Sequence, residues 1–334
     1  MAWSRRGNLK LRMLAGVAVS AGLIASIAGC ASGGAEGEGP SGTVVWYSSK
    51  APDYNDALIE AFNEQYPDVN VEVMRAITGD ITVRYSSERS AGAATADVVT
   101  QSDSAFLAEG QDQGWWKTDS EIDEGYPEEA YDDGVLVASY HEMMLGHSTQ
   151  AFPESLGSWE DLLKPELKGR LVLVDPRGEP GYLAWYQVLA EEYGEDFLSD
   201  LAAQEPRFVT SAVPGGETVS SGGADVLAPV ALSSINALME SGAPLAIEPF
   251  APSTTIEVYT VVSNEAQNPE GSAAFFEFLS SKEGQEAFNG EVTSSARTDV
   301  EGPPALSEGL VPLGDVLPRA QENRDEIVGT LGLE

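Results

Sequence analysis

Three short polar segments follow predicted strands along the chain, and their side chains could bind a polar or anionic group. They are Ser48-Ser49-Lys50, Thr78-Gly79 and Ser102-Asp103-Ser104. In open α/β sheets, ligands bind beyond the carboxyl ends of the strands, and hydroxyl groups beside the first turn of a helix suit an anion. The same residue types also cap helices. The pattern therefore predicts ligand contact, with helix capping alone as the alternative.

A second group of candidate binding residues lies in the later half of the chain. Arg177 and Gly178 follow another predicted strand, and a guanidinium can hold a carboxylate or phosphate through two parallel hydrogen bonds. Tyr182, at the start of the next predicted helix, and the polar segment Ser253-Thr254 are the other candidates. For Arg177 the alternative is a surface ion pair with one of the many acidic residues.

The sequence holds no strong catalytic motif. His141-Glu142 and His147 come nearest to a zinc motif, but their spacing does not place both histidines at positions i and i+4 of a helix. The sequence contains neither a G-x-S-x-G elbow nor a G-x-x-x-x-G-K-[ST] loop. We therefore predict no catalytic residue, no metal ligand and no cofactor, and keep a secreted metal-dependent hydrolase as a remote alternative.

The elements that must position these residues alternate between strand and helix. Hydrophobic periodicity predicts strands at residues 43–47, 69–73, 97–100, 170–174, 207–210, 245–248 and 256–262. It predicts helices at residues 54–66, 81–91, 182–193, 230–240, 268–279 and 282–288. Such alternation implies right-handed crossovers and parallel sheets, and the pattern occurs twice in series.

The first residues predict export. Residues 1–12 hold four basic residues and no acidic one, and the apolar run that follows ends at residue 28. The run is shorter than the roughly 20 residues of a membrane-spanning helix, so it is typical of a signal peptide. Arg5-Arg6 and their neighbours resemble a twin-arginine export signal, with the general export route as the alternative.

The single cysteine closes this segment. Ile27-Ala28-Gly29-Cys30 resembles the lipobox of bacterial lipoproteins, which implies a lipid on Cys30; an ordinary signal peptide is the alternative. Residues 31–42 are mainly Gly, Ser, Ala and Glu, a composition that predicts a flexible tether. Because there is no second cysteine, no intramolecular disulfide can form and stability must come from a hydrophobic core.

The net charge is strongly negative. It is −36 for the whole chain, and removal of residues 1–29, with four bases and no acid, takes it to −40. Such a surface opposes binding to nucleic acid or anionic lipid headgroups. Since the acidic residues are scattered, we interpret the charge as a solubility feature suited to a saline habitat, with a cation-binding role for the charge as the alternative.

Several segments, in a fixed order, resemble a known family. They are residues 44–49 with Ala61-Phe62 and Tyr66-Pro67, Glu88 with Ala96-Asp97-Val98, residues 158–163 with 167–170 and 175–177, and residues 268–270 with 275–285. Together they resemble the extracellular solute-binding proteins of ABC importers, in the branch that includes ferric-iron binders and phosphonate or sugar-phosphate binders. The resemblance covers nearly all of the chain after the tether.

This resemblance implies an α/β, two-lobed periplasmic-binding-protein-like fold of type II, with a two-strand hinge and a ligand cleft between the lobes. We expect lobe one at residues 43–138 plus 257–334 and lobe two at 139–256, with hinge crossings near 135–140 and 256–262. Closure about such a hinge buries the ligand. The implied partners are a small-molecule ligand and the importer's permease and ATPase, and we expect a monomer anchored through Cys30 on the extracellular face of the cell membrane or in the periplasm.

The resemblance leaves two kinds of ligand open. Ferric-binding relatives supply adjacent tyrosines shortly after a stretch that matches Gly222–Val226, and the corresponding residues 228–234 contain no tyrosine. A hard ferric ion needs several anionic oxygen ligands. We therefore favour an organic anion such as a phosphonate or sugar phosphate, with ferric iron held by a non-standard ligand set as the alternative.

Overall fold

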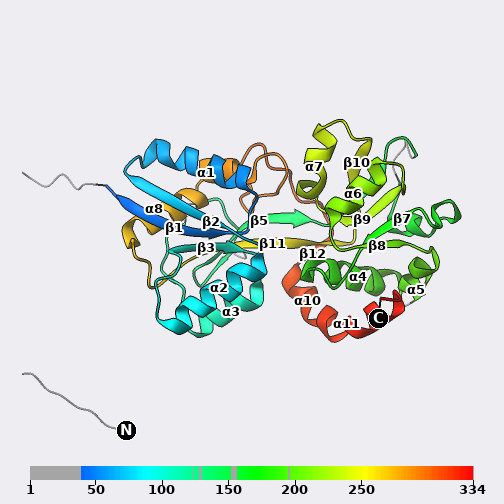
Figure 1. Ribbon diagram of the computed structural model, residues 1–334, viewed down its shortest axis with the longest axis horizontal. Coiled ribbons are helices and arrows are strands. Elements are labelled where there is room, and N and C mark those ends of the chain that lie inside the picture. Colours follow the sequence, from blue (N-terminus) through cyan, green and yellow to red (C-terminus); the bar gives the residue numbers. More distant parts are fainter. Residues whose placement is uncertain (1–38, 123, 128–129, 152–155, 195, 334) are drawn as a thin grey trace, which may run out of the picture. The chain divides into compact units, whose positions relative to one another are not determined.

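The computed structural model describes residues 39–122, 124–127, 130–151, 156–194 and 196–333, and the residues from Gly39 onward form one compact unit. Two β-sheets organise this unit, each with helices on both faces (Figure 1). The predicted signal segment and Cys30 lie outside the described residues. No helix among the described residues is long and apolar enough to cross a membrane.

The first sheet has seven strands, in the order β2-β1-β3-β11-β5-β4, and β12 pairs with β11. Strand β1 runs parallel to β2 and β3, whereas β11 runs antiparallel to β3 and β5. The strand bounds are Gly42–Ser48 (β1), Val69–Arg75 (β2), Val98–Gln101 (β3), Tyr131–Asp132 (β4), Val135–Glu142 (β5), Ser253–Val262 (β11) and Leu310–Val311 (β12).

Alternation along β1 builds a separate core on each face of this sheet. Val44 and Trp46 point into the core that α1, α8 and α9 cover, and Tyr47 points into the core under α2 and α3, as expected for the two-residue repeat of a strand. The helix bounds are Pro52–Gln65 (α1), Thr78–Ala91 (α2), Ser104–Asp112 (α3), Pro269–Ser280 (α8) and Lys282–Asn289 (α9).

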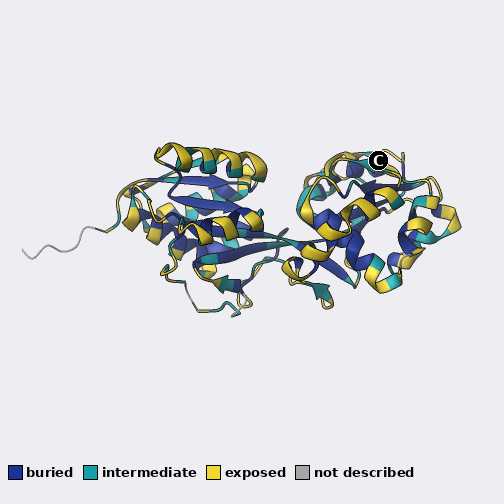
Figure 2. Cartoon of the chain, turned by 90° about the horizontal axis from the view of Figure 1, so that it is seen from below, coloured by how far each residue is buried: buried dark blue, intermediate teal, exposed yellow. Residues whose placement is uncertain are grey.

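The second sheet has five strands in the order β10-β6-β9-β7-β8. Every residue of β7 and β9 is buried, because helices cover both faces of this sheet; Figure 2 shows buried strands beneath helices with exposed outer faces. The strands are Met144–Ser148 (β6), Leu171–Val174 (β7), Arg207–Val209 (β8), Val226–Val230 (β9) and Leu245–Glu248 (β10). The helices are Pro180–Tyr193 (α4), Asp196–Ala203 (α5), Ala212–Ser220 (α6) and Leu232–Glu240 (α7), with 3-10 turns at Trp159–Leu163 (η2) and Pro165–Leu167 (η3).

The chain passes between the sheets at two neighbouring places. Strand β5 ends at Glu142 and β6 begins at Met144, whereas β10 ends at Glu248 and β11 begins at Ser253. The antiparallel pairing of β5 with β11 continues as far as Glu142 and Thr255. The exchange of sheets therefore lies a few residues closer to the second sheet than the predicted crossings.

The last helices pack mainly against the helices of the second sheet, although α10 also touches β11. Helices α10 (Leu313–Glu322) and α11 (Arg324–Thr330) contribute Ala320, Ile327 and Leu331 to the core of the second sheet. Leu313 also packs with Ala184 of α4. The sequence predicts that residues 257–334 all belong to lobe one. This packing leads us to propose that the residues from Leu313 onward belong with lobe two. The other lobe boundaries stay a prediction.

The aromatic core beside α8 yields a stability prediction. Phe275 is fully buried, and its ring centroid lies 5.1 Å from those of Trp46 and Phe62. Replacing Phe275 with Ala should lower the free energy of unfolding by about 3–5 kcal/mol, since the cavity cannot collapse. Denaturant unfolding measures the loss. Val83→Ala, at a side chain that is 67% exposed, should change it by less than about 0.5 kcal/mol, and equal effects would contradict the role of this core.

Candidate functional site

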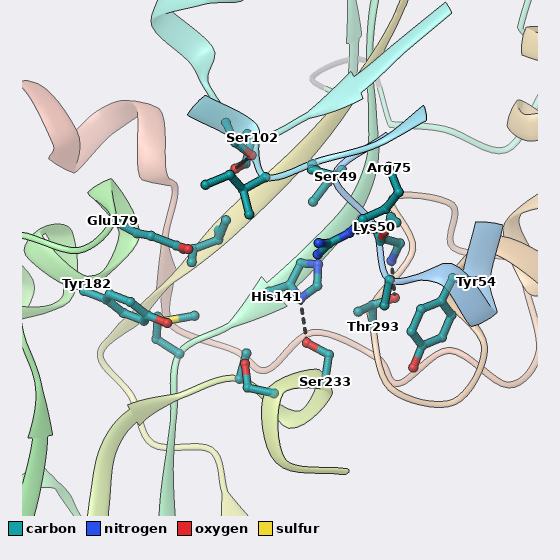
Figure 3. A pocket seen from close by; sticks show the side chains of 18 residues that line it. Ser49, Lys50, Tyr54, Arg75, Ser102, His141, Glu179, Tyr182, Ser233 and Thr293 are labelled. Carbon is teal, nitrogen blue, oxygen red and sulfur yellow. Dashed lines mark hydrogen bonds between the residues drawn. The ribbon is translucent and has the colours of Figure 1, made fainter. Parts of the chain in front are cut away.

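A cavity of about 310 Å³, here called the first cavity, lies where elements of both sheets meet (Figure 3). The first sheet and its connections contribute residues that follow β1, β2 and β3, together with residues of β5 and β11. The second sheet contributes residues that follow β7 and β9. This is the region beyond the carboxyl ends of parallel strands where α/β sheets bind ligands. Its polar lining residues are Ser49, Lys50, Tyr54, Arg75, Thr78, Ser102, His141, Glu179, Tyr182, Ser233, Ser234 and Thr293.

Lys50 supplies a buried amino group at one end of the cavity. Its Nζ donates a 2.9 Å hydrogen bond to Thr293 Oγ1 and lies 5.0 Å and 4.6 Å from the ring centroids of Tyr54 and Phe288. The side chain is 5% exposed, and burial lowers the pKa of Lys50 from 10.5 to about 7. The amine is therefore balanced between its charged and neutral forms at neutral pH.

Arg75 places a permanent positive charge in the wall of the same cavity. It is the last residue of β2, and its Nε donates to the carbonyl oxygen of Lys50 at 3.4 Å. Figure 3 shows its guanidinium pointing into the cavity toward His141. Neither Lys50 nor Arg75 forms an ion pair with any residue in the described part of the chain. This end of the cavity therefore suits an anion.

His141 connects the two halves of the site. It lies on β5 of the first sheet, and its Nδ1 is 2.8 Å from the hydroxyl of Ser233 at the start of α7. Burial, and to a smaller extent the charge of Lys50, lower the pKa of His141 to about 3. The imidazole is therefore neutral at physiological pH and can donate or accept a hydrogen bond without adding charge.

Glu179 and Tyr182 form the opposite end of the cavity. Although Glu179 is exposed at the cavity wall, the surrounding protein displaces water from its carboxyl group and raises its pKa. Burial, and then the nearby charge of Glu179, raise the pKa of Tyr182. The phenol therefore stays protonated and can serve as a hydrogen-bond donor. The site thus has a basic end and, beyond the neutral His141, an end with one carboxyl group.

The structure brings five of the predicted binding residues into the first cavity: Ser49, Lys50, Thr78, Ser102 and Tyr182. Four others line a neighbouring cavity: Gly79, Asp103, Ser104 and Gly178. Asp103 also caps α3, since its Oδ1 accepts 3.1 Å hydrogen bonds from the amides of Ala105 and Phe106. Asp103 therefore both caps a helix and lines a cavity.

Three predicted hydroxyl groups are buried away from either cavity. Ser48 Oγ bonds to Asn55 Oδ1 at 2.8 Å, and Thr254 Oγ1 donates to the carbonyl of Val311 at 2.8 Å. The hydroxyl of Ser253 donates to the carbonyl of Met143. The sequence predicts the polar segment Ser253-Thr254 as a ligand-binding loop before a strand, but β11 begins at Ser253 and pairs with β12 there. These hydroxyls therefore satisfy backbone groups inside the sheet.

Arg177 does not line the first cavity. Its Nε lies 3.0 Å from Asp175 Oδ1, and its Nη1 donates to the carbonyl of Leu333 at 2.6 Å. The guanidinium therefore forms an ion pair with Asp175, and this interaction holds the pKa of Asp175 below its usual value. The surface ion pair given above as the alternative is the arrangement that the structure shows.

Sequence reasoning missed most of the polar residues that line the first cavity. Arg75 could have been found, because it ends β2 in the same way that Ser48-Ser49-Lys50 ends β1. Thr293 lies 243 residues from Lys50 in the sequence, and no local signal joins them. The other residues that were not predicted are Tyr54, His141, Glu179, Ser233 and Ser234.

The described residues offer no group of three or more His, Cys, Asp or Glu side chains arranged to hold a metal ion. His141 and His147 lie on separate strands, and His147 Nε2 is 3.2 Å from Glu248 Oε1. The pair therefore does not form the zinc site weighed above.

Comparison with known proteins agrees with this architecture. The family model described as "Bacterial extracellular solute-binding protein" matches residues 43–291. Similar structures include the substrate-binding protein of an ABC transporter from Agrobacterium tumefaciens, with 18% identity, a TM-score of 0.67 and coverage of 84% of this chain and 94% of that one. Iron-bound HitA from Pseudomonas aeruginosa has 17% identity, a TM-score of 0.69 and coverage of 85% of this chain and 99% of that one.

A third similar structure is AfuA from Actinobacillus pleuropneumoniae with fructose-6-phosphate bound, with 18% identity, a TM-score of 0.66 and coverage of 87% of this chain and 99% of that one. These likenesses confirm the predicted two-lobed α/β fold. At such identities they show the fold alone.

Proposed function

Because this chain belongs to the bacterial extracellular solute-binding proteins, we propose that it captures a small organic anion and delivers it to the permease of an ABC importer. The observation that carries the choice of ligand is the pair Lys50 and Arg75. The chain holds 54 acidic residues and only 18 basic ones, yet two basic side chains without an acidic partner among the described residues meet in one cavity. An anionic group would complete their electrostatics and hydrogen bonding.

The hydroxyl groups around the cavity support an oxyanion or a polyhydroxylated ligand. Ser49 on one side and Ser234 on the other can each donate a hydrogen bond. The hydroxyls of Thr78 and Ser102 lie 3.1 Å apart and bond to each other, so one of the two can donate to a ligand. AfuA was solved with a sugar phosphate, which has both kinds of group. We propose a phosphonate, a sugar phosphate or a similar molecule as the ligand.

Ferric iron is the competing ligand, since HitA was solved with iron bound. Two tyrosines, Tyr54 and Tyr182, do line the cavity, but burial raises the pKa of both phenols. The positive charge of Arg75 also opposes a trivalent cation. These features favour the organic anion.

The delivery role rests on the family and on the first residues of the chain. We propose that the signal segment exports the protein, that a lipid on Cys30 anchors it at the extracellular face of the membrane or in the periplasm, and that a monomer meets the permease, which an ATPase drives. The lipobox-like sequence that ends at Cys30 and the tether-like residues 31–42 support this arrangement.

A thermal-shift screen of the metal-stripped protein tests the proposed function. The panel contains ferric citrate, methylphosphonate, fructose 6-phosphate, spermidine and glucose. A ligand at 100 times its Kd should add about 2.7 kcal/mol of stability, which raises the Tm by several degrees. We expect a rise with the phosphonate or the sugar phosphate. A rise with ferric citrate alone, reproduced by another ferric salt, would overturn the choice of ligand.

A further inference from the structure

A second cavity, of about 410 Å³, adjoins the first. The two share Ile77, Thr78, Ser102, Glu179 and Ile256 in their walls. In Figure 3 Ser102 and Glu179 lie on the side of the first cavity away from Lys50 and Thr293. The second cavity therefore continues from the end that carries the carboxyl group, not from the basic end.

The wall of the second cavity differs in composition from the wall of the first cavity. Apolar side chains come from Pro180, Ile256, Leu313 and Leu317, and no Lys or Arg lies among its lining residues. Asp103, which caps α3, adds a second carboxylate to that of Glu179. Two of the apolar residues belong to α10, which lies beyond residues 43–291 that match the family model. Part of this wall is thus supplied by a segment of the chain that the family match does not include.

Glu179 stands where the two cavities meet, directly before α4. Its carboxyl group receives no hydrogen bond from a residue in the described ranges. A second anionic group on the ligand would be repelled there, whereas a hydroxyl or amino group could donate to the carboxylate. The junction therefore admits a ligand body that is neutral or bears a hydrogen-bond donor.

We propose that the second cavity is a subsite for the uncharged, partly apolar body of a ligand whose anionic group lies at Lys50 and Arg75. This deepens the proposed function and rests on it. The substrate class is an extended organic anion with one anionic end, such as an alkyl- or arylphosphonate with a hydroxyl or amino group in its body. Inorganic oxyanions would leave the second cavity empty, and polycarboxylates such as citrate would bring negative charge to Glu179.

A homologous ligand series tests the subsite in the unmodified protein. Calorimetry with methylphosphonate, propylphosphonate and phenylphosphonate compares bodies of increasing size on a constant anionic group. Burial of two further methylene groups should make propylphosphonate bind about 15-fold more tightly than methylphosphonate. Equal affinities across the series would overturn the subsite and leave the anion site standing. If none of the three bound, both the proposed organic-anion ligand and the subsite would be overturned.

A variant that fills the cavity gives an independent readout. Leu317→Trp, which enlarges a lining residue of α10, should bring the propyl-to-methyl affinity ratio from about 15 to about 1. Glu322→Trp adds the same bulk at an exposed residue of the same helix that lies outside the cavity wall, and it should keep the ratio. An unchanged ratio in Leu317→Trp would show that the ligand body lies elsewhere.

A charged tail tests the role of Glu179. We expect 3-phosphonopropionate to bind at least 10-fold more weakly than propylphosphonate, and Glu179→Gln to recover most of that loss because the amide carries no charge. Propylphosphonate, measured on the same variant, reports any general damage to the site. If the charged tail bound as well as propyl, Glu179 would have no part in selecting the ligand.

Discussion

Replacement of Arg75 with Ala should weaken methylphosphonate binding by about 10- to 150-fold, the equivalent of about 1.5–3 kcal/mol for hydrogen bonds to a charged group. Arg75 is the one permanently positive side chain among the described lining residues of the first cavity, because Lys50 is only partly protonated near pH 7. A planar guanidinium can also bind two phosphonate oxygens at once. Isothermal calorimetry at pH 6.5, where Lys50 remains mostly charged, isolates the contribution of Arg75.

Arg177→Ala is the matched control for this measurement. Both side chains are arginines at the carboxyl-terminal side of a parallel strand, but Asp175 and the carbonyl of Leu333 hold Arg177 outside the first cavity. Its removal should leave affinity within about twofold. Arg75→Lys should give an intermediate loss, since an ammonium group lacks the fork of donors. If Arg177→Ala strongly weakened binding and Arg75→Ala did not, the anion would bind at Arg177, as the sequence predicts.

Sequence periodicity predicted the elements with strong local patterns. The segments 69–73, 170–174 and 245–248 lie within or nearly coincide with β2, β7 and β10, and the helix from Asn268 is α8. The pattern failed where tertiary pairing decides the local structure. Ser253 and Thr254 read as a loop because they are polar, but pairing with Leu310 and Val311 extends β11 through them. Helix α10 was not predicted, and Pro318 lies inside it.

The candidate site was predictable only in part, because it combines local turns with distant contacts. The rule that ligands bind beyond strand ends found Ser49, Lys50 and Ser102, all of which line the first cavity. It could not find the contact of His141 with Ser233, 92 residues away. It also could not separate Lys50 from Arg177, since whether a basic side chain is free for a ligand depends on which acidic residues the fold places beside it.

Lys50 should make anion binding weaken as the pH rises. Burial holds its pKa at about 7 in the free protein, and a bound anion favours the charged ammonium and so raises that pKa. Binding above pH 7 therefore requires proton uptake, and affinity should fall by up to about tenfold per pH unit between pH 7 and 8.5. Propanesulfonate is a suitable ligand, because its own charge is constant over this range.

The other titratable groups that face Lys50 should not produce this slope. The pKa of His141 is lowered to about 3, the pKa of Tyr54 is raised above its ordinary value, and Arg75 stays charged. Lys50→Met removes the amine and should flatten the pH dependence, and calorimetry in buffers of different ionisation enthalpy should lose the uptake of up to one proton. Lys164→Met, at a surface ion pair with Asp161, should keep the slope. An equal slope in Lys50→Met would assign the titration to another group and leave Arg75 as the only cation that the ligand requires.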